Sequence, residues 1–352
     1  MRESTSAGLP CMIMRGGTSR GAFFLADDLP VAVAERDALL ASVMGSPDSR
    51  QTDGIGGGHP LTSKVAIVSR SADPRADVDY LFLQVGVDDA TVSDRQNCGN
   101  LLAAVGQFAV ERGLVAVRGR QASVRVRMVN STGYARSTFP LRGGKVDYRR
   151  AVDTVGVPFA GARCEIDFID TAGSVCGALL PTGSPVDVFD GIAATCVDNG
   201  MPIVLALADD LGVTGHETIG ELESDHRLRA GLARLRLAAG EAMGLGAVGA
   251  LTIPKVCLIA PPLLGGTIST RTFIPVRCHA SIGVLAAAGV AAACHIAGTV
   301  AADLAVPPLT PCRIEAPAGT LTVTVTVDSG PVVTRTSVVR AARKIFDGIV
   351  YP

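Results

Sequence analysis

The first half of the chain is dominated by short hydrophobic runs and by runs in which hydrophobic and polar residues alternate. Both patterns indicate β-strands, and they predict strands at Cys11–Met14, Ala22–Leu25, Lys64–Ser69, Val78–Val87, Ala122–Val129, Lys145–Tyr148 and Arg163–Ile169. Two segments have helical spacing instead. One is Val31–Met44, and the other follows Asn97-Cys98-Gly99-Asn100 and runs to Arg112, where Gly113 ends it.

The second half of the chain repeats landmarks of the first half at a constant spacing. Ala26 and Ala208 each begin the sequence Ala-Asp-Asp-Leu. Asn97 and His279 each open a predicted helix rich in small residues, and they are separated along the chain by the same spacing as the first pair. Two landmarks in the same order at one spacing predict a duplicated domain.

The boundary between the two predicted domains falls at Gly183 and Pro185, which interrupt the pattern. A length of 352 residues also favours two cores over one. We therefore expect domains of residues 1–185 and 186–352. The end of the chain returns to strand alternation, and we expect a strand near residues 341–352 to pack back onto the first domain.

Composition excludes several classes of function. Hydrophobic residues make up 48% of the chain and charged residues 18%, which favours buried cores over disorder. A formal net charge of -1 provides no field that would attract nucleic acid or an anionic membrane. Aromatic residues are only 4%, with no Trp, so platforms for base stacking are scarce. We expect no nucleic-acid partner.

The cysteines and histidines do not form metal or disulfide patterns. The 9 cysteines are scattered without a Cys-x-x-Cys pair, and the 5 histidines lack metal-ligand spacing. Residues 1–10 lack the apolar centre of a signal peptide. These observations predict reduced thiols, a cytoplasmic location and no metal site.

One segment has the length of a membrane span. Residues 280–298 contain no Asp, Glu, Lys or Arg. The segment is mostly Ala and Gly, which insert weakly into a bilayer, and it is the only one of its kind. A helix that is apolar all round can instead form the centre of a large domain. We therefore expect a buried helix and no membrane.

Cys98 is the strongest candidate for chemistry. It stands at the start of a predicted helix, where backbone N–H groups and the helix dipole favour a thiolate. Gly99 permits close approach of other atoms, and Asn97 and Asn100 make the loop polar. The alternative is an ordinary buried cysteine. The polar loop favours a thiol that transfers protons.

Lys64 enters a predicted strand directly after the glycine-rich segment Gly56–Pro60. A lysine that loses hydration there has a lowered pKa and can act as a base. A solvated lysine at a strand edge is an equally good interpretation from position alone. The loop is not a phosphate-binding P-loop, because Ser63 precedes Lys64 and Val65 follows it, where that motif needs Gly-Lys-Ser/Thr.

Further residues near these loops are candidates for binding an anionic substrate. Glycine backbones offer N–H groups, and arginines pair with carboxylates through two hydrogen bonds. A solvated side chain is an equally good interpretation for each arginine. The candidate substrate-binding residues are Arg15, Gly17, Thr18, Ser19, Gly57, Gly58, His59, Ser63, Asn97, Gly99, Asn100, Met201, Arg271, Arg277, His279 and Ser281.

Seven motifs along essentially the whole chain resemble those of the PrpF family. They are Arg15-Gly16-Gly17-Thr18-Ser19-Arg20-Gly21, Asp53-Gly54-Ile55-Gly56-Gly57, Leu61-Thr62-Ser63-Lys64-Val65, Asn97-Cys98-Gly99-Asn100, Asp170-Thr171-Ala172-Gly173, Asp198-Asn199-Gly200-Met201-Pro202 and Ala341-Ala342-Arg343-Lys344. Within that family the chain looks most similar to the 4-oxalomesaconate tautomerases of lignin and gallate breakdown.

The resemblance implies an α+β fold of the diaminopimelate epimerase type. In that fold two pseudo-symmetric domains each wrap β-structure around a central helix. The resemblance assigns the family's catalytic lysine to Lys64 and its cysteine to Cys98, and it implies catalysis without a metal or organic cofactor. Racemases of this fold have a second cysteine at the second central helix. Here that helix is expected to begin at His279, with Cys278 just before it, which favours one lysine paired with one thiol.

The activity that we expect is an isomerase acting on a small polycarboxylate. It would move a proton along an unsaturated tricarboxylate, 4-oxalomesaconate, by an allylic or a keto–enol route. One alternative is an isomerase of 2-methylaconitate or methylitaconate. An alternative from another class is a non-catalytic accessory protein of an aconitase-like enzyme, which would not need Lys64 and Cys98. A homodimer is the default expectation for its assembly.

Overall fold

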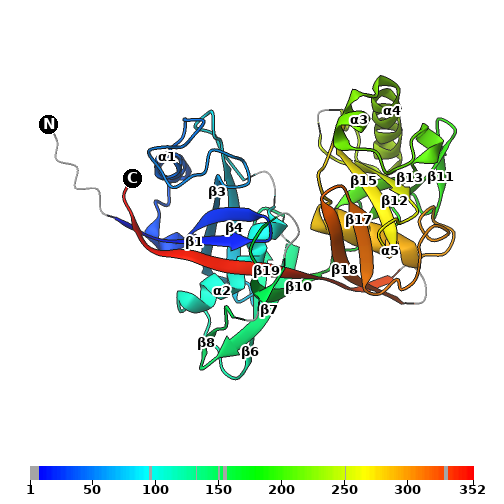
Figure 1. The fold of residues 1–352 in the computed structure, drawn as a ribbon. Helices are drawn as coiled ribbons and strands as arrows, with labels where there is room; N and C mark the ends of the chain where they lie inside the picture. The colour runs from blue at the N-terminus through cyan, green and yellow to red at the C-terminus, as the bar shows by residue number, and fades with distance from the viewer. Residues whose placement is uncertain are drawn as a thin grey trace. The chain divides into compact units, whose positions relative to one another are not determined.

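The computed structural model describes residues 8–94, 97–131, 133–149, 151–153, 157–249, 251–328 and 332–352. The chain forms two compact units (Figure 1). Unit 1 comprises residues 1–167 and 339–352, and unit 2 comprises residues 168–338. The division falls after Asp167, within the strand Gly161–Ile169, and so earlier than the boundary that we expected between residues 185 and 186.

Unit 1 is a ring of paired β-strands around one helix. The ring is built from β1 (Leu9–Gly16), β2 (Ser19–Leu25), β3 (Lys64–Arg70), β4 (Val78–Val85), β6 (Gln121–Met128), β7 (Gly133–Arg142), β10 (Gly161–Ile169) and the last part of β19 (Val332–Val350). Each strand pairs with the next, and β19 pairs with both β10 and β1, which closes the ring. Helix α2 (Gly99–Glu111) packs against β1, β2, β3, β4, β6 and β7, and its residues Leu101–Ala109 are all buried.

The remaining elements of unit 1 are shorter or lie outside the ring. They are η1 (Ala26–Asp28), α1 (Val33–Met44), β5 (Val92–Ser93), β8 (Lys145–Val146) and β9 (Ala151–Val152). Helix α1 packs on the outer face of β3 and β4 through Leu40, Val43 and Met44. The strands and helices predicted for this half of the chain agree with these elements to within a few residues.

Unit 2 repeats the same architecture around helix α5 (Val284–His295). Its strands are β11 (Asp187–Phe189), β12 (Ile192–Asp198), β13 (Pro202–Leu207), β14 (Lys255–Ala260), β15 (Ile268–Ile274), β16 (Arg277–Cys278), β17 (Cys312–Ala316), β18 (Gly319–Asp328) and the first part of β19. Helices α3 (Ile219–Ser224) and α4 (His226–Ala242) cover the outer face of this sheet, preceded by η2 (Asp209–Leu211).

The two units share the order of their strand pairings. From β1 to β7, the pairings β1–β2, β2–β3, β3–β4, β4–β6 and β6–β7 are alternately antiparallel and parallel. From β12 to β18, the pairings β12–β13, β13–β14, β14–β15, β15–β17 and β17–β18 follow the same alternation. This repeated order agrees with the predicted duplication.

The register of the parallel pairs aligns the two units residue by residue. Val65 lies opposite Ala22, and Val256 lies opposite Val204. Val204 follows Ala22 at the same spacing that separates the two Ala-Asp-Asp-Leu sequences, so the spacing predicted from the sequence is preserved in the sheet. It follows that Lys64, the first residue of β3, and Lys255, the first residue of β14, occupy equivalent positions.

Helix α5 confirms the predicted buried helix and corrects its start. Residues Ala286–Cys294 are all buried although the helix carries no charged face, because the strands of unit 2 surround it. The helix begins at Val284 with Gly283 as its N-cap, not at His279. A turn precedes it, closed by the Ser281 N–H donating to Nδ1 of His279 (2.9 Å). No helix in the part of the chain that the structure describes is both long and apolar enough to cross a membrane.

Candidate active site

Cys98 is the N-cap residue of α2, as the sequence predicted. Its backbone is extended (φ −122°, ψ 94°), and its side chain is buried. The Cys98 carbonyl accepts a hydrogen bond from the N–H of Leu102 (3.1 Å) and another from the hydroxyl of Tyr80 (3.2 Å). The thiol therefore lies at the positive end of a buried helix, and the Tyr80 side chain of β4 fixes the Cys98 backbone.

The β1–β2 hairpin packs directly on the first turn of α2. A Cβ on Gly16 would lie 2.1 Å from the carbonyl oxygen of Asn100, and a Cβ on Gly17 would lie 2.3 Å from its Oδ1. Only glycine fits this contact, and Gly17 also has a positive φ (52°). The Asn100 amide donates to the hydroxyl oxygens of Thr18 (3.0 Å) and Ser19 (3.4 Å). The predicted residues of this hairpin are thus brought to the N-terminus of α2.

Lys64 lies on the same inner side of the ring and is almost fully buried, with 7% of its surface exposed. Its Nζ donates to Oε1 of Gln84 (2.7 Å) and lies 4.9 Å from the centre of the Phe82 ring. Burial lowers the pKa of Lys64, and the negative charge of a Cys98 thiolate opposes that shift. The lysine and the thiol are therefore close enough for the charge of one to act on the other.

Strand β4 positions both chemical groups. Tyr80, Phe82 and Gln84 alternate along the strand and so face the same side. Tyr80 bonds the Cys98 carbonyl, Phe82 lies under the Lys64 ammonium and Gln84 accepts its hydrogen bond. Sequence reasoning missed these three residues. The alternation of Val78–Val85 places them on one face, but only the register shows that this face meets Lys64.

The glycine-rich loop before β3 is organised by Gln51, another residue that sequence reasoning missed. Gln51 is buried, and its Nε2 donates to the Ser63 hydroxyl (2.7 Å). Its Oε1 accepts from the N–H of Gly58 (3.0 Å), which has a positive φ (61°). The predicted residues Gly58 and Ser63 are therefore structural neighbours joined through one amide.

Two other predicted residues of unit 1 lie at the edge of this site. His59 is exposed, and its Nδ1 accepts from the N–H of Leu61 (3.1 Å). Asn97 donates through Nδ2 to the hydroxyl of Ser131. A Cβ on Gly57 would lie 2.7 Å from Nη2 of Arg20, so Arg20 supports the glycine loop from β2.

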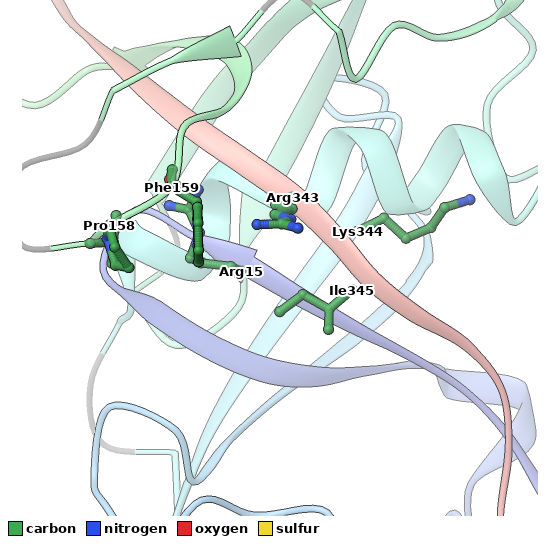
Figure 2. A pocket seen from close by; sticks show the side chains of 7 residues that line it. Arg15, Pro158, Phe159, Arg343, Lys344 and Ile345 are labelled. Carbon is green, nitrogen blue, oxygen red and sulfur yellow. Dashed lines mark hydrogen bonds between the residues drawn. The ribbon is translucent and has the colours of Figure 1, made fainter.

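Arg15 is not brought to Lys64 and Cys98. It points to the opposite face of β1 from Gly16, and its guanidinium donates to the carbonyl oxygens of Gly17 (2.7 Å) and Phe159 (3.0 Å). There it lines a separate surface pocket of about 340 Å³ with Phe159 and Arg343 (Figure 2). Burial and the Arg343 charge lower the pKa of Arg15.

In unit 2 the structure separates the predicted residues. Arg271 is buried on the same side of β15 as Phe273, which packs against the α3–α4 layer and not against α5. Its Nε donates to the carbonyl of Glu217 (3.0 Å). Arg277 is exposed on β16, and Met201 is half-buried in the turn between β12 and β13.

A second lysine lies at the N-terminal end of α5. A Cβ on the N-cap Gly283 would lie 3.8 Å from Nζ of Lys255. Burial lowers the pKa of Lys255, and desolvation together with the Lys255 charge lowers the pKa of His279. Within the described residues, Lys255 has no hydrogen-bond or ion-pair partner. Sequence reasoning missed Lys255, although its position at the start of a strand matches that of Lys64.

No group of His, Cys, Asp and Glu side chains in the described ranges is arranged to hold a metal ion. The groups that the structure brings to the start of α2 are an amine, a thiol and backbone N–H groups. These groups transfer protons and stabilise an enolate oxygen.

Comparison with known proteins places this geometry in context. The model of the family described as PrpF protein matches residues 7–352. The (4E)-oxalomesaconate Delta-isomerase of Novosphingobium sp. (strain KA1) is 50% identical over 99% of this chain and 99% of its own length. The 4-oxalomesaconate tautomerase of Pseudomonas putida (strain KT2440) is 50% identical over 97% of this chain and 95% of its own length.

Among solved structures, the crystal structure of a methylitaconate-delta-isomerase superposes with a TM-score of 0.90. It is 32% identical and covers 99% of this chain and 96% of its own length. The predicted α+β class and the resemblance stated from the motifs are confirmed by these matches.

Proposed function

Because the chain belongs to the PrpF family, we propose that it isomerises 4-oxalomesaconate by transferring a proton between two carbons of the substrate, with Lys64 and Cys98 as the acid–base pair. The chain is an isomerase, as are the relatives that match its full length. The observation that carries the residue assignment is the buried Lys64 amine, held by Gln84 on the same face of β4 from which Tyr80 bonds the carbonyl of Cys98 at the start of α2.

The first step takes a proton from a carbon of the substrate that lies between a keto group and a carbon–carbon double bond. The neutral amine of Lys64 accepts this proton, since burial favours the form without charge. The electron pair moves into a dienolate, whose oxygen accepts hydrogen bonds from backbone N–H groups. The first-turn amides of α2, beginning at Gly99, have no partner within the helix itself and are suited to that role.

The second step returns a proton at the far carbon of the allylic system. The Cys98 thiol donates it and becomes a thiolate, and the Lys64 ammonium then re-protonates the thiolate. No proton is gained or lost over the cycle. In a keto–enol version the proton returns to oxygen instead of carbon, and the same two groups suffice.

Substrate carboxylates need donors outside the reacting pair. In unit 1 we assign this role to the hydroxyls and N–H groups of Thr18, Ser19 and Asn100, which meet at the start of α2. Unit 2 has a lysine of its own, Lys255, beside the loop of His279 and Ser281, and this lysine lacks a partner among the described residues. An ammonium of that kind attracts an anion.

The test is a progress curve with 4-oxalomesaconate followed by ultraviolet absorbance, with NMR of the product formed in deuterium oxide. We expect conversion with deuterium at the allylic carbon, and loss of conversion in Lys64→Met and Cys98→Ser. If both variants are as active as the unmodified protein, Lys64 and Cys98 are not the acid–base pair. Absence of conversion, with turnover of methylitaconate or 2-methylaconitate instead, would assign the chain to the substrate of its more distant relatives.

The non-catalytic alternative makes the opposite prediction for the same two variants. An accessory protein of an aconitase-like enzyme would tolerate the replacement of Lys64 and Cys98. Burial of a lysine beside a thiol is costly for a protein that makes no use of either group. The arrangement therefore favours an enzyme.

A further inference from the structure

Gln84 faces Lys64 across the β3–β4 pair. The two residues are direct register partners, and Oε1 of Gln84 lies 2.7 Å from Nζ of Lys64. The contact is thus built into the sheet and does not depend on a loop. Phe82, two residues earlier on the same face, limits the other side of the ammonium.

The orientation of the Gln84 amide is determined by its other contacts. Its Nε2 donates to the carbonyl oxygens of Ser63 (2.8 Å) and Pro60 (3.1 Å). Those carbonyls only accept hydrogen bonds, so the NH₂ group must face them, and Oε1 must face the lysine. The amide therefore presents an acceptor to Lys64 whatever the protonation state of the amine.

We propose that Gln84 is a positioning residue for the reaction, which aims the Lys64 nitrogen while leaving it free to gain and lose a proton; the proposal rests on the function proposed above for Lys64. A neutral acceptor bonds one N–H of either the ammonium or the amine. With one N–H fixed and Phe82 on one side, the remaining lone pair of the amine is directed away from β4. A carboxylate at this position would instead hold the lysine in its charged form.

The second unit provides an internal contrast. Val256 pairs with Phe273, so the register brings Ile274 opposite Lys255, where Gln84 stands opposite Lys64. The lysine is kept in both units, but the amide acceptor is present only at the one beside a thiol. If the residue opposite the lysine served packing alone, there would be no reason for an amide at position 84 and an aliphatic side chain at position 274.

Other groups around Lys64 do not replace this contact. From α2, Cys98 acts on the lysine through its charge. From β4, Tyr80 bonds the Cys98 carbonyl. From β2, Arg20 bonds the carbonyl of Ile55, and from the glycine loop His59 bonds the N–H of Leu61. Each of these side chains has a contact of its own, and among the described residues Gln84 is the one whose side-chain oxygen bonds the lysine nitrogen.

The experiment compares Gln84→Glu with Gln84→Met, and uses the same two substitutions at Gln121, an exposed residue of β6, as a control. The readout is the pH dependence of kcat/KM together with NMR titration of the lysines. The chain has only four, Lys64, Lys145, Lys255 and Lys344, so the signal of Lys64 is assigned by its loss in Lys64→Met.

We expect opposite shifts. Gln84→Glu should move the acid limb of kcat/KM and the Lys64 titration to higher pH by about one unit or more, because a carboxylate stabilises the ammonium. Gln84→Met should move both to lower pH, because the Lys64 ammonium loses its hydrogen-bond acceptor. It should also reduce kcat about tenfold with little change in KM, because the Lys64 nitrogen is no longer held in position while substrate binding is unaffected. The Gln121 variants should change neither.

Unchanged Lys64 titration in both folded Gln84 variants would overturn the proposal, as would shifts in the same direction. The NMR readout needs no substrate, so it also separates this proposal from the proposed function. If the protein fails to convert 4-oxalomesaconate but the opposite titration shifts are found, the positioning role stands and the substrate assignment fails.

Discussion

The two units carry the same lysine on the same strand of the same scaffold, and they differ in what surrounds it. Lys64 meets Gln84, Phe82 and the charge of Cys98. Lys255 meets the glycine N-cap of α5. The helix N-cap is therefore a thiol in unit 1 and a residue without a side chain in unit 2.

Each unit places a lysine near the N-terminus of its central helix, and the lysine of unit 1 also has a thiol and an amide acceptor beside it. The proton-transfer role that we propose for Lys64 rests on this difference. An amine alone provides charge, and charge binds an anion. An amine with a nearby thiol and a fixed acceptor can pass a proton. The comparison can be tested by changing each position and its counterpart.

The largest expected effect separates the two lysines. Lys64→Met should reduce kcat by about 10³-fold or more, because the proton acceptor is removed. Lys255→Met should leave kcat within a few-fold, because the N-cap beside this lysine carries no thiol to pair with it. Steady-state kinetics of both variants, with circular dichroism to establish folding, provides the measurement. Equal losses of kcat in the two variants would contradict the division of roles.

The next effect separates the two N-caps. Cys98→Ser should reduce kcat by about 10²-fold or more, because a hydroxyl is a far weaker acid than a thiol and does not return the proton. Gly283→Ser should leave kcat within a few-fold, because the nearest atom to its new Cβ is 3.8 Å away and serine is a favourable N-cap. A large loss of kcat in Gly283→Ser would show that the N-cap of α5 takes part in the reaction.

A smaller effect concerns stability and pH. Burial lowers the pKa of both Lys64 and Lys255, so the unfolded chain binds their protons more tightly than the folded protein does. Stability from these groups therefore rises with pH between the lowered pKa and the ordinary value of 10.5. At neutral pH each Lys→Met variant should be more stable than the unmodified protein, because the cost of burying the charged ammonium is removed.

Denaturant unfolding at several pH values measures this effect. The gain in stability of each variant should shrink as pH approaches 10.5. A variant that is less stable than the unmodified protein at neutral pH would mean that the lysine makes stabilising contacts which outweigh the cost of its burial.

The smallest effect separates two glycines with positive φ in the corresponding turns. Gly17→Ala and Gly200→Ala should each cost about 1 kcal/mol of stability from backbone strain. Only Gly17→Ala should also lower kcat, because its Cβ displaces Oδ1 of Asn100, whereas the Cβ at Gly200 meets the movable side chain of Leu285. Thermal unfolding and kinetics of both variants decide this, and equal kcat values would count against the role of the hairpin contact.

Much of this site could be predicted because its residues are local in sequence. Cys98 at the start of a helix and Lys64 after a glycine-rich loop are patterns of neighbouring residues. The motif resemblance then covered the whole chain, and the matching family model confirms it. The catalytic roles of these two residues remain predictions.

The partners of these residues could not be predicted, because they come from other strands. Gln84 reaches Lys64 only through the register of β3 and β4, and Gln51 reaches Ser63 across a loop. Arg15 and Arg271 were predicted to bind substrate because they lie near motif residues in sequence. Strand alternation instead turns each side chain to the face away from its central helix.

The sequence by itself predicted the duplication at a constant spacing and singled out Lys64 and Cys98, because both depend on the order of neighbouring residues. The α+β class followed from the resemblance of seven motifs to the PrpF family, which the family model confirms. The tertiary structure alone decided where each unit ends, that α5 begins at Val284, and which side chains touch Lys64. Those depend on strand register and on burial, because a shift of one residue would turn every side chain of a strand to the other face.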